Sequence, residues 1–319
     1  MQAMIFAAGL GTRLKPLTDR IPKALVSVGG EPLLKRVIFQ LKDAGFTRIV
    51  VNVHHFSKQI IDYLRDNKNF GMDIRISDES EKLLETGGGI KKAWPFFDQT
   101  EPILIHNVDI LSNVDLKKFY QMESKELVDD SLDSMKEKAP LAARLLVSER
   151  KTKRYLLFDD TMRLVGWTNI ETGEVKSPYP DLNPEDYKMY AFSGIHMVAP
   201  SLFPLMENEP DKFPIMDFYL KHCDKVRIEG YVKNDQKPFE LAKFLLHEKN
   251  EKLIQRINYS MTADSLKIKK LVVGSVKVEP QIPLFITYYT LYPFAKGVVS
   301  YPDVYGFDGV IFEQLKKYL

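Results

Sequence analysis

The chain has little cysteine, no long apolar run and almost no net charge. Cys223 is the single cysteine among 319 residues, which excludes an internal disulfide and fits a reducing compartment. No apolar stretch approaches the roughly 18 residues of a membrane-spanning helix, and no basic region or cleavage site of a secretory signal is visible at the N-terminus. We therefore expect a cytoplasmic protein with no membrane partner.

The charge balance also bears on partners. A formal net charge of +2 leaves no basic footprint, so nucleic acid is not an expected partner. Hydrophobic residues at 45% and charged residues at 28% are typical of a globular protein, and the length suffices for two domains with cores of their own. The sequence gives no indication of the oligomeric state.

Strand and helix patterns alternate through the first hundred residues. Apolar runs predict strands, and stripes of apolar residues at helical spacing predict helices. The expected strands are 2–8, 48–53, 73–77 and 102–106, and the expected helices are 31–44, 58–64 and 89–94. This alternation predicts a mostly parallel sheet with helices on both faces. Ligands bind at the carboxyl ends of the strands in such sheets, where the loop after residue 8 and Asp109 both fall.

A glycine-rich loop follows the first expected strand. Gly9 and Gly11 allow a tight turn that brings backbone N–H groups close to an anion. Arg13 adds a planar fork suited to phosphate oxygens, and Lys23 adds a second positive charge after a proline. The loop is therefore predicted to bind a polyphosphate.

Three ordered motifs carry a resemblance to a known family. The pattern G-x-G-T-R, P-x-T, P-K-x-L over 9–25 resembles the signature of the sugar-phosphate nucleotidyltransferases, which join a sugar 1-phosphate to a nucleotide and release pyrophosphate. Residues 84–90 resemble the base-recognition segment of the subgroup containing the muramic acid 1-phosphate uridylyltransferases and the mannose 1-phosphate guanylyltransferases. Residues 106–109 are similar to the family's strand-end Asn-Gly-Asp, whose aspartate holds Mg²⁺, with Val108 in place of the glycine. The resemblance covers about 1–233.

The resemblance implies a fold and an activity. The fold is α/β, a three-layer Rossmann-like, mostly parallel sheet of the nucleotidyltransferase type with a small C-terminal α+β appendage. The activity is Mg²⁺-assisted in-line attack by a sugar 1-phosphate on the α-phosphorus of an NTP, which gives an NDP-sugar and pyrophosphate. An NTP, with UTP favoured and GTP next, and a sugar 1-phosphate are the expected partners, and Mg²⁺ is the expected cofactor.

The resemblance also assigns roles to residues. The implied catalytic residues are Arg13, Lys23 and Asp109. The implied nucleotide-binding residues are Ala8, Gly9, Gly11, Thr12, Arg13, Gly87 and Gly88. The implied sugar-phosphate-binding residues are Lys23, Asn107, Asn169, Glu171 and Gly194. The implied metal ligands are Asp109 and Glu240.

Several of these residues have alternative interpretations. Gly87 and Gly88 could form a flexible start of a helix, and Asp109 could cap one, although Asp115 fits a cap better. The family has an Asp-Val-Gly segment that supplies the second metal ligand. Ungapped matching puts Glu240 at its aspartate and Ala242 at its glycine. Asp235 is an alternative ligand, and Glu240 could also lie on the surface of a helix.

The C-terminal part differs in pattern from the rest. We expect a nucleotidyltransferase domain over 1–235 and an appendage over 236–319, with a helix at 237–247, a strand at 282–290 and a last helix through 319. The appendage resembles the C-terminal end of peptidoglycan L,D-transpeptidases. The glycine of their Ser-His-Gly-Cys motif is missing before Cys223, so transpeptidase chemistry is not expected.

Two alternatives follow from this tail. One is a catalytically impaired nucleotide- or sugar-phosphate-binding protein with a cell-wall-related appendage, and a weaker one is an active L,D-transpeptidase. Cys223 is interpreted as an inert buried residue. His54 and His55 are interpreted as structural, because no cysteine or Glu-x-x-His pattern supports a zinc site.

Overall fold

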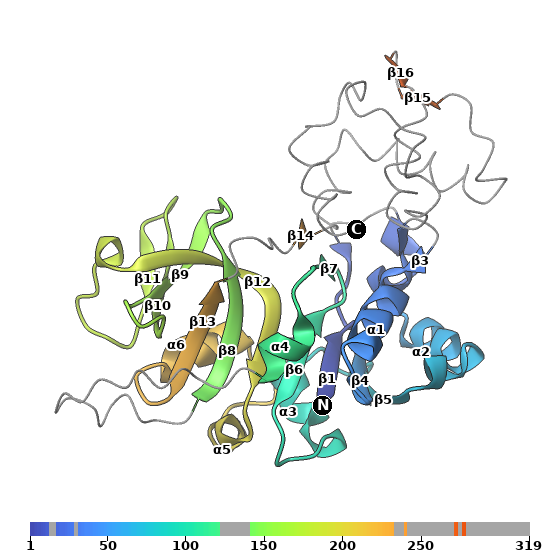
Figure 1. Ribbon diagram of the computed structural model, residues 1–319, viewed down its shortest axis with the longest axis horizontal. Coiled ribbons are helices and arrows are strands. Elements are labelled where there is room, and N and C mark those ends of the chain that lie inside the picture. The colour runs from blue at the N-terminus through green and yellow to red at the C-terminus, as the bar shows by residue number, and fades with distance from the viewer. Residues whose placement is uncertain are drawn as a thin grey trace.

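The computed structural model describes residues 1–12, 17–28, 31–121, 141–232, 239–240, 271–273 and 276–278. Its centre is a ten-stranded sheet (Figure 1). The strands of this sheet are β1 (Gln2–Phe6), β4 (Arg48–Val53), β5 (Asp73–Asp78), β6 (Ile103–Asn107), β8 (Leu141–Ser148), β9 (Arg154–Phe158), β10 (Leu164–Asn169), β11 (Glu174–Lys176), β12 (Lys188–Val198) and β13 (Arg227–Val232). Shorter strands are β2 (Ser27–Val28), β3 (Glu31–Pro32), β7 (Ile110–Leu111), β14 (Phe239–Glu240), β15 (Leu271–Val273) and β16 (Val276–Val278).

Helices connect and cover these strands. The α-helices are α1 (Leu33–Asp43), α2 (Ser57–Asp66), α3 (Glu85–Ala93), α4 (Leu116–Gln121), α5 (Phe203–Glu207) and α6 (Ile215–His222). The strand and helix assignments expected over the first hundred residues are confirmed, with ends that differ by a few residues. Ends differ because the last turn of a helix and the last pair of a ladder depend on tertiary contacts.

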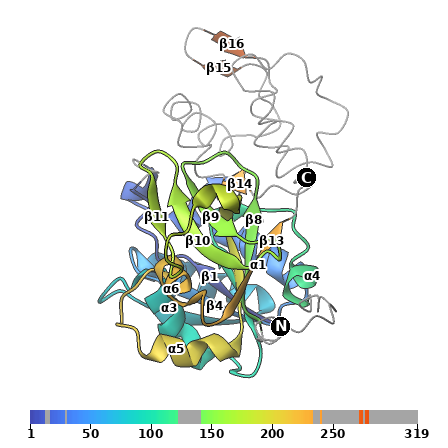
Figure 2. The ribbon, with the colours of Figure 1, turned by 90° about the vertical axis from the view of Figure 1, so that its left-hand side faces the viewer.

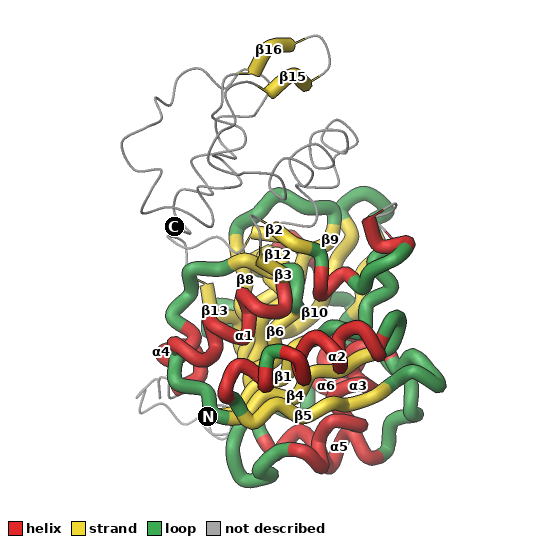
Figure 3. The backbone as a smooth tube through the Cα atoms, turned by 90° about the vertical axis from the view of Figure 1, so that its right-hand side faces the viewer, coloured by secondary structure: helices red, strands yellow, loops and turns green. Residues whose placement is uncertain are grey.

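The sheet separates two apolar cores. Ala3 and Ile5 of β1 pack in one core with α1, α2 and α4, while Met4 between them packs in the other with α3, α5 and α6. Side chains of a strand alternate between the two faces, so an apolar run such as β1 is buried on both. Figure 3 shows the face covered by α1 and α2, and Figure 2 the face with α3, α5 and α6. This arrangement confirms the predicted three-layer α/β fold class, but the sheet is mixed rather than mostly parallel, because β9–β12 pair antiparallel.

The sheet is parallel at its centre and reversed at β12. β1 pairs in parallel with β4 and β6, and β4 pairs in parallel with β5. β12 runs antiparallel to β6 over 195–198, and its earlier residues 188–190 pair with β9. The start of β12 and the β9–β11 strands therefore extend beyond the carboxyl end of β6, on the side where a ligand is expected.

Three short strands belong to the C-terminal part. β14 pairs antiparallel with β7, which follows β6, and β15 pairs with β16. The helix expected at 237–247 is wrong at Phe239 and Glu240, because pairing with β7 draws these two residues into a strand against their local pattern. The predicted domain boundary after 235, the strand at 282–290 and the last helix lie outside the described residues.

No helix in the described ranges is long and apolar enough to cross a membrane.

Two buried histidines should make the protein less stable in mild acid. Burial lowers the pKa of His106 from 6.5 to about 4 and that of His196 from 6.5 to about 3. Between pH 6.5 and about 4 the unfolded chain binds protons that the native protein does not, so the free energy of unfolding falls as the pH falls. We expect a loss of about 1.4 kcal/mol per pH unit for each histidine within this window.

Urea unfolding at several pH values between 7 and 4.5 checks this expectation. His196→Gln removes one of the two titrating groups and should reduce the slope of stability against pH by about half. An unchanged slope in that variant would show that the acid sensitivity arises elsewhere.

Candidate active site

The glycine-rich loop leaves β1 at the carboxyl edge of the sheet and is held at both ends. At its start, the N–H groups of Ala7 and Ala8 donate to Asn52 Oδ1, at 2.8 and 3.3 Å. Near its end, the Thr18 hydroxyl donates to the Gly11 carbonyl oxygen at 2.7 Å. Gly11 has a φ of +64°, and a Cβ there would lie 2.8 Å from Thr18 Cγ2. Glycine is therefore required at position 11 by the loop itself.

Gly9 differs from Gly11. A Cβ at Gly9 would meet no atom of the described residues within 4 Å, and its φ is not in the left-handed region. Nothing within the described part of the chain explains a glycine here, whereas an anion that approaches the backbone would. Thr12 is exposed beside it, and the predicted phosphate ligand Arg13 lies outside the described residues.

Lys23 and Asp109 meet at the same edge. Lys23 begins a 3₁₀ turn, Lys23–Leu25, and Asp109 lies two residues after the end of β6. The Lys23 ammonium donates to the Asp109 carboxylate, and their side chains are 22% and 10% exposed. The structure therefore brings together two of the three predicted catalytic residues, 86 positions apart, beside the glycine-rich loop.

Asn107 and Gly194 lie next to this pair. Gly194 has a φ of +78° and falls where the β12 ladder shifts its register, between Phe192 and His196. A Cβ on Gly194 would come within 2.9 Å of Asn107 Nδ2 and of the Ile110 side chain. Only glycine allows β12 to approach the end of β6 this closely.

Glu240 is placed beside Asp109 by its backbone. In the β7–β14 pair, Glu240 is opposite Ile110, the residue that follows Asp109. The alternative ligand Asp235 lies outside the described residues. Strand pairing therefore brings the backbone of Glu240 next to Ile110, from a strand rather than from a helix surface, and its role as a metal ligand stays a prediction.

The acidic residues available here suit a hard cation. Among the residues with described placement, no three or more His, Cys, Asp or Glu side chains gather as metal ligands. Mg²⁺ is held by one or two carboxylates together with water and phosphate oxygens, and does not need a cage of protein ligands. Asp109 is one carboxylate of this kind at the edge of the sheet, 10% exposed, and a second ligand stays a prediction.

The glycines of α3 have a packing role. The N–H groups of Gly87 and Gly88 both donate to the Phe213 carbonyl oxygen, at 2.8 and 3.2 Å. Added Cβ atoms would lie within 3.0 Å of the Phe213 ring and of the Asp211 carbonyl oxygen, respectively. A base could therefore reach Gly87 and Gly88 only through other backbone atoms, and their role in nucleotide binding stays a prediction.

Asn169 and Glu171 have local roles at the end of β10. Asn169 Oδ1 accepts from the Glu171 N–H at 3.1 Å, and the Glu171 carboxylate forms an ion pair with Lys153 at 2.6 Å. Within the described ranges, neither side chain bonds to the residues around Asp109. Their predicted contact with the sugar phosphate is untested.

The interpretation of Cys223 as a buried residue is confirmed, and His54 has a contact with the backbone. Cys223 is buried, its thiol is within 3.5 Å of the Leu220 carbonyl oxygen, and burial raises its pKa to about 12. A thiol of that pKa does not act as a nucleophile near neutral pH. His54 has its Nδ1 atom 2.6 Å from the Glu79 carbonyl oxygen.

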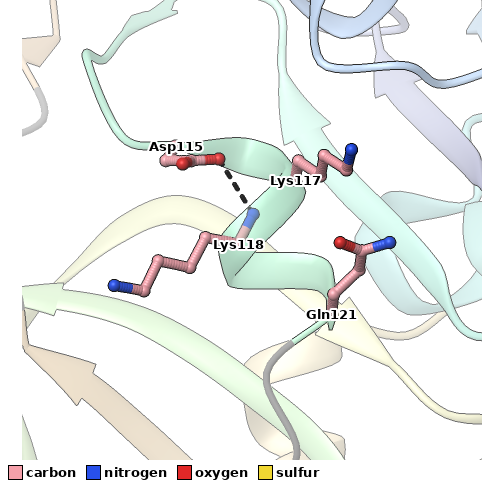
Figure 4. Close-up of a pocket in the computed structure, with 4 residues that line it drawn as sticks. All are labelled: Asp115, Lys117, Lys118 and Gln121. Carbon is pink, nitrogen blue, oxygen red and sulfur yellow. Dashed lines mark hydrogen bonds between the residues drawn. The ribbon is translucent and has the colours of Figure 1, made fainter.

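A shallow depression on α4 is separate from these residues. It is lined by Asp115, Lys117, Lys118 and Gln121 (Figure 4). Asp115 Oδ1 accepts from the Lys118 N–H at 2.9 Å, which is the geometry of a helix cap. Asp115 is therefore the capping residue, as expected, and Asp109 is left for another role.

The sequence interpretation missed Asn52 and Glu79. Both side chains are 1% exposed, and both bond to the segments around the edge of the sheet. The available signal was a polar residue inside the apolar strand β4, since a buried polar side chain needs partners.

Comparison with known proteins agrees with this geometry. The nucleotidyl transferase family model matches residues 2–134. The N-acetylmuramate alpha-1-phosphate uridylyltransferase of Neisseria meningitidis is 44% identical over 124 residues, 39% of this chain and 53% of the relative. The mannose-1-phosphate guanyltransferase of Pichia angusta is 30% identical over 223 residues, 68% of this chain and 56% of the relative.

A solved structure shows the same fold. HddC from Yersinia pseudotuberculosis, in complex with GMP-PN, superposes with a TM-score of 0.55 at 22% identity, over 79% of this chain and 99% of HddC. The chain spans about half the length of the two curated relatives described above. Residues 2–134, which carry the glycine-rich loop, Lys23 and Asp109, are thus the part of the chain that matches the nucleotidyl transferase family model.

Proposed function

We propose that this protein transfers a nucleotidyl group from an NTP to a sugar 1-phosphate and releases pyrophosphate. The observation that carries the proposal is the contact of Lys23 with Asp109 beside the glycine-rich loop, at the carboxyl edge of a parallel sheet. The names of the relatives support the same reaction class. A cytoplasmic location, favoured by the single cysteine, is part of the proposal.

The reaction needs positioning and charge neutralisation. An oxygen of the sugar 1-phosphate attacks the α-phosphorus in line, a new O–P bond forms, and the bond to the β-phosphate oxygen breaks as pyrophosphate leaves. Lys23 would balance the charge of the reacting phosphates, and Arg13 that of the leaving pyrophosphate. The backbone around Gly9 would line the phosphate chain.

We propose Mg²⁺ as the cofactor, with Asp109 and Glu240 as its protein ligands. The ion would supply positive charge at the phosphate oxygens where negative charge develops. The pairing of Glu240 with Ile110 supports this choice of second ligand.

The names of the relatives guide the choice of base. UTP is our first choice, because the more similar of the two relatives is named as a uridylyltransferase, and GTP is second. Pyrophosphate detection with UTP, GTP, CTP, dTTP and ATP against several sugar 1-phosphates, with Mg²⁺ and with EDTA, tests the proposal. We expect release with UTP that EDTA abolishes. No release from any combination would favour a binding protein without catalytic activity.

Two glycines of the loop should behave in opposite ways. Gly9→Ala should leave the free energy of unfolding within about 0.5 kcal/mol of wild type, because no residue with described placement lies within 4 Å of an added Cβ. It should nevertheless raise the KM for the NTP, since phosphates would lie against this backbone. Gly11→Ala should cost about 1–3 kcal/mol through its left-handed φ and its contact with Thr18.

Thermal unfolding and NTP titration of both variants provide the measurement. Wild-type NTP affinity in Gly9→Ala would mean that the phosphates bind elsewhere.

A further inference from the structure

A buried hydrogen-bond chain links the glycine-rich loop to the start of α3. Asn52 lies on β4 with its side chain 1% exposed. Its Oδ1 atom accepts from the N–H groups of Ala7 and Ala8, and its Nδ2 atom donates to Glu79 Oε1 at 2.8 Å. One amide side chain therefore fixes two consecutive peptide groups of the loop.

Glu79 extends this hydrogen-bond network to the start of α3. Its Oε2 atom accepts from the N–H of Leu84, the residue before α3, at 3.1 Å. Its own N–H donates to the Val53 carbonyl oxygen at 2.7 Å, which anchors it to the end of β4. The two carboxylate oxygens thus hold different elements, the loop through Asn52 and the start of α3 directly.

A carboxylate in this position costs free energy. Glu79 is 1% exposed, and no Lys or Arg in the described part of the chain forms an ion pair with it. Burial of a charge without an opposite charge is unfavourable, and two N–H donors offset only part of that cost. An apolar residue at position 79 would pack without this cost. The bonds that Glu79 makes to Asn52 and Leu84 therefore need an explanation other than stability.

Gly89 makes room for the same pair. A Cβ at position 89 would lie 2.9 Å from Glu79 Oε1 and 3.3 Å from Asn52 Nδ2. The first two glycines of α3 pack against 211–213, so the third serves a different contact. The glycine run of the base-recognition segment therefore includes a position set by the Asn52–Glu79 pair.

We propose that Asn52 and Glu79 are positioning residues that couple the phosphate-binding loop to the base-recognition segment. The inference rests on the proposed function and deepens it. Glu79 bonds directly to Leu84 and to Asn52. A displacement at the start of α3 is therefore transmitted through Asn52 to Ala7 and Ala8. Nucleotide selection at one segment is thereby linked to phosphate placement at the other.

Exchange of the two side-chain types tests the coupling. Asn52→Asp places a carboxylate opposite the Glu79 carboxylate. Glu79→Gln provides one acceptor for two donors, so its NH₂ group faces either the Asn52 NH₂ group or the Leu84 N–H. In the double variant N52D/E79Q, the amide introduced at position 79 donates to the carboxylate introduced at position 52, and the amide oxygen accepts from the Leu84 N–H. Every hydrogen bond of the network is then restored, and only the bond between positions 52 and 79 has its donor and acceptor exchanged. We expect each single variant to lose about 10²-fold in kcat/KM for the NTP, and the double variant to recover most of it.

Tyr219→Phe is the matched control. It removes a buried hydrogen bond of similar length, 2.7 Å to His196 Nδ1, far along the sheet from Asn52. It should lower the unfolding temperature while kcat/KM stays at the wild-type value below that temperature. Loss of activity in the single variants that merely follows their loss of stability, or no recovery in the double variant, would overturn the coupling.

Hydrogen exchange gives a readout that does not require catalysis. In Glu79→Gln the amides of 7–8 and the amide of Leu84 should both exchange faster than in wild type, and in the double variant both should return to wild-type rates. Unchanged exchange at 7–8 would overturn the inference. An inactive wild-type protein with the expected exchange pattern would instead contradict the proposed function and leave the coupling supported.

Discussion

Asp109→Asn is expected to lower the rate of pyrophosphate release by about 10²–10³-fold, the usual cost of removing one group that stabilises charge in a transition state. The substitution keeps the size of the side chain and removes the negative charge that Lys23 contacts beyond the end of β6. Steady-state rates with UTP and a sugar 1-phosphate check the expectation. Lys23→Met should give a loss of similar size, because it removes the other half of the pair.

Asp115→Asn is the matched control for this experiment. Asp115 lies a few positions further along the chain and caps α4 through its bond to the Lys118 N–H. Asparagine caps a helix as well as aspartate does, so the rate and the unfolding temperature should both stay at wild-type values. Equal activity in Asp109→Asn and in wild type would remove Asp109 from the catalytic site.

Gly88→Ala is expected to cost about 3 kcal/mol of the free energy of unfolding, a value typical of an overpacked core. The added Cβ would overlap the Asp211 carbonyl oxygen, which is backbone and cannot turn aside. Relief would require α3 to move away from 211–213, and that movement would break the bonds from Gly87 and Gly88 to Phe213. Chemical unfolding of the purified variant provides the measurement.

Gly173→Ala separates crowding from backbone conformation. Gly173 has a φ of +72°, but nothing within 4 Å of an added Cβ. Its substitution should cost about 1 kcal/mol, the strain of a left-handed residue alone. If Gly88→Ala were no more destabilising than Gly173→Ala, the close packing of α3 against 211–213 would be wrong.

The sequence predicted those parts of the fold whose cause is local. The apolar runs of β1, β4, β5 and β6 and the helical stripe of α1 are properties of short windows, and the structure has an element at each. The carboxyl edge of the sheet followed from the strand–helix alternation. The glycine-rich loop and Asp109 were therefore predicted to lie at the same edge.

Other features depend on partners distant in the sequence. Phe239 and Glu240 have the local pattern of a helix but pair with Leu111 and Ile110 of β7, far earlier along the chain. The glycines at 87 and 88 suggested a flexible or ligand-binding segment, whereas their neighbours lie at 211–213. A helix pattern or a glycine run carries no information about which distant segment will lie against it.

The Asn52–Glu79 pair was missed for a related reason. A single asparagine in an apolar strand signals a buried polar contact, but its partners come from three separate segments: 7–8, Glu79 and, through Glu79, Leu84. Only the assembled sheet edge brings those segments within hydrogen-bond distance. The positions of Arg13 and of the appendage beyond 240 were predicted from sequence and are not tested by the described residues.

The most direct test of the central claim is the stoichiometry of the reaction in the purified full chain. With UTP, Mg²⁺ and a sugar 1-phosphate, the account predicts one pyrophosphate released for each NDP-sugar formed, and no release when the sugar 1-phosphate is omitted. Pyrophosphate release without the sugar 1-phosphate, or none with any combination of NTP and sugar 1-phosphate, would contradict it.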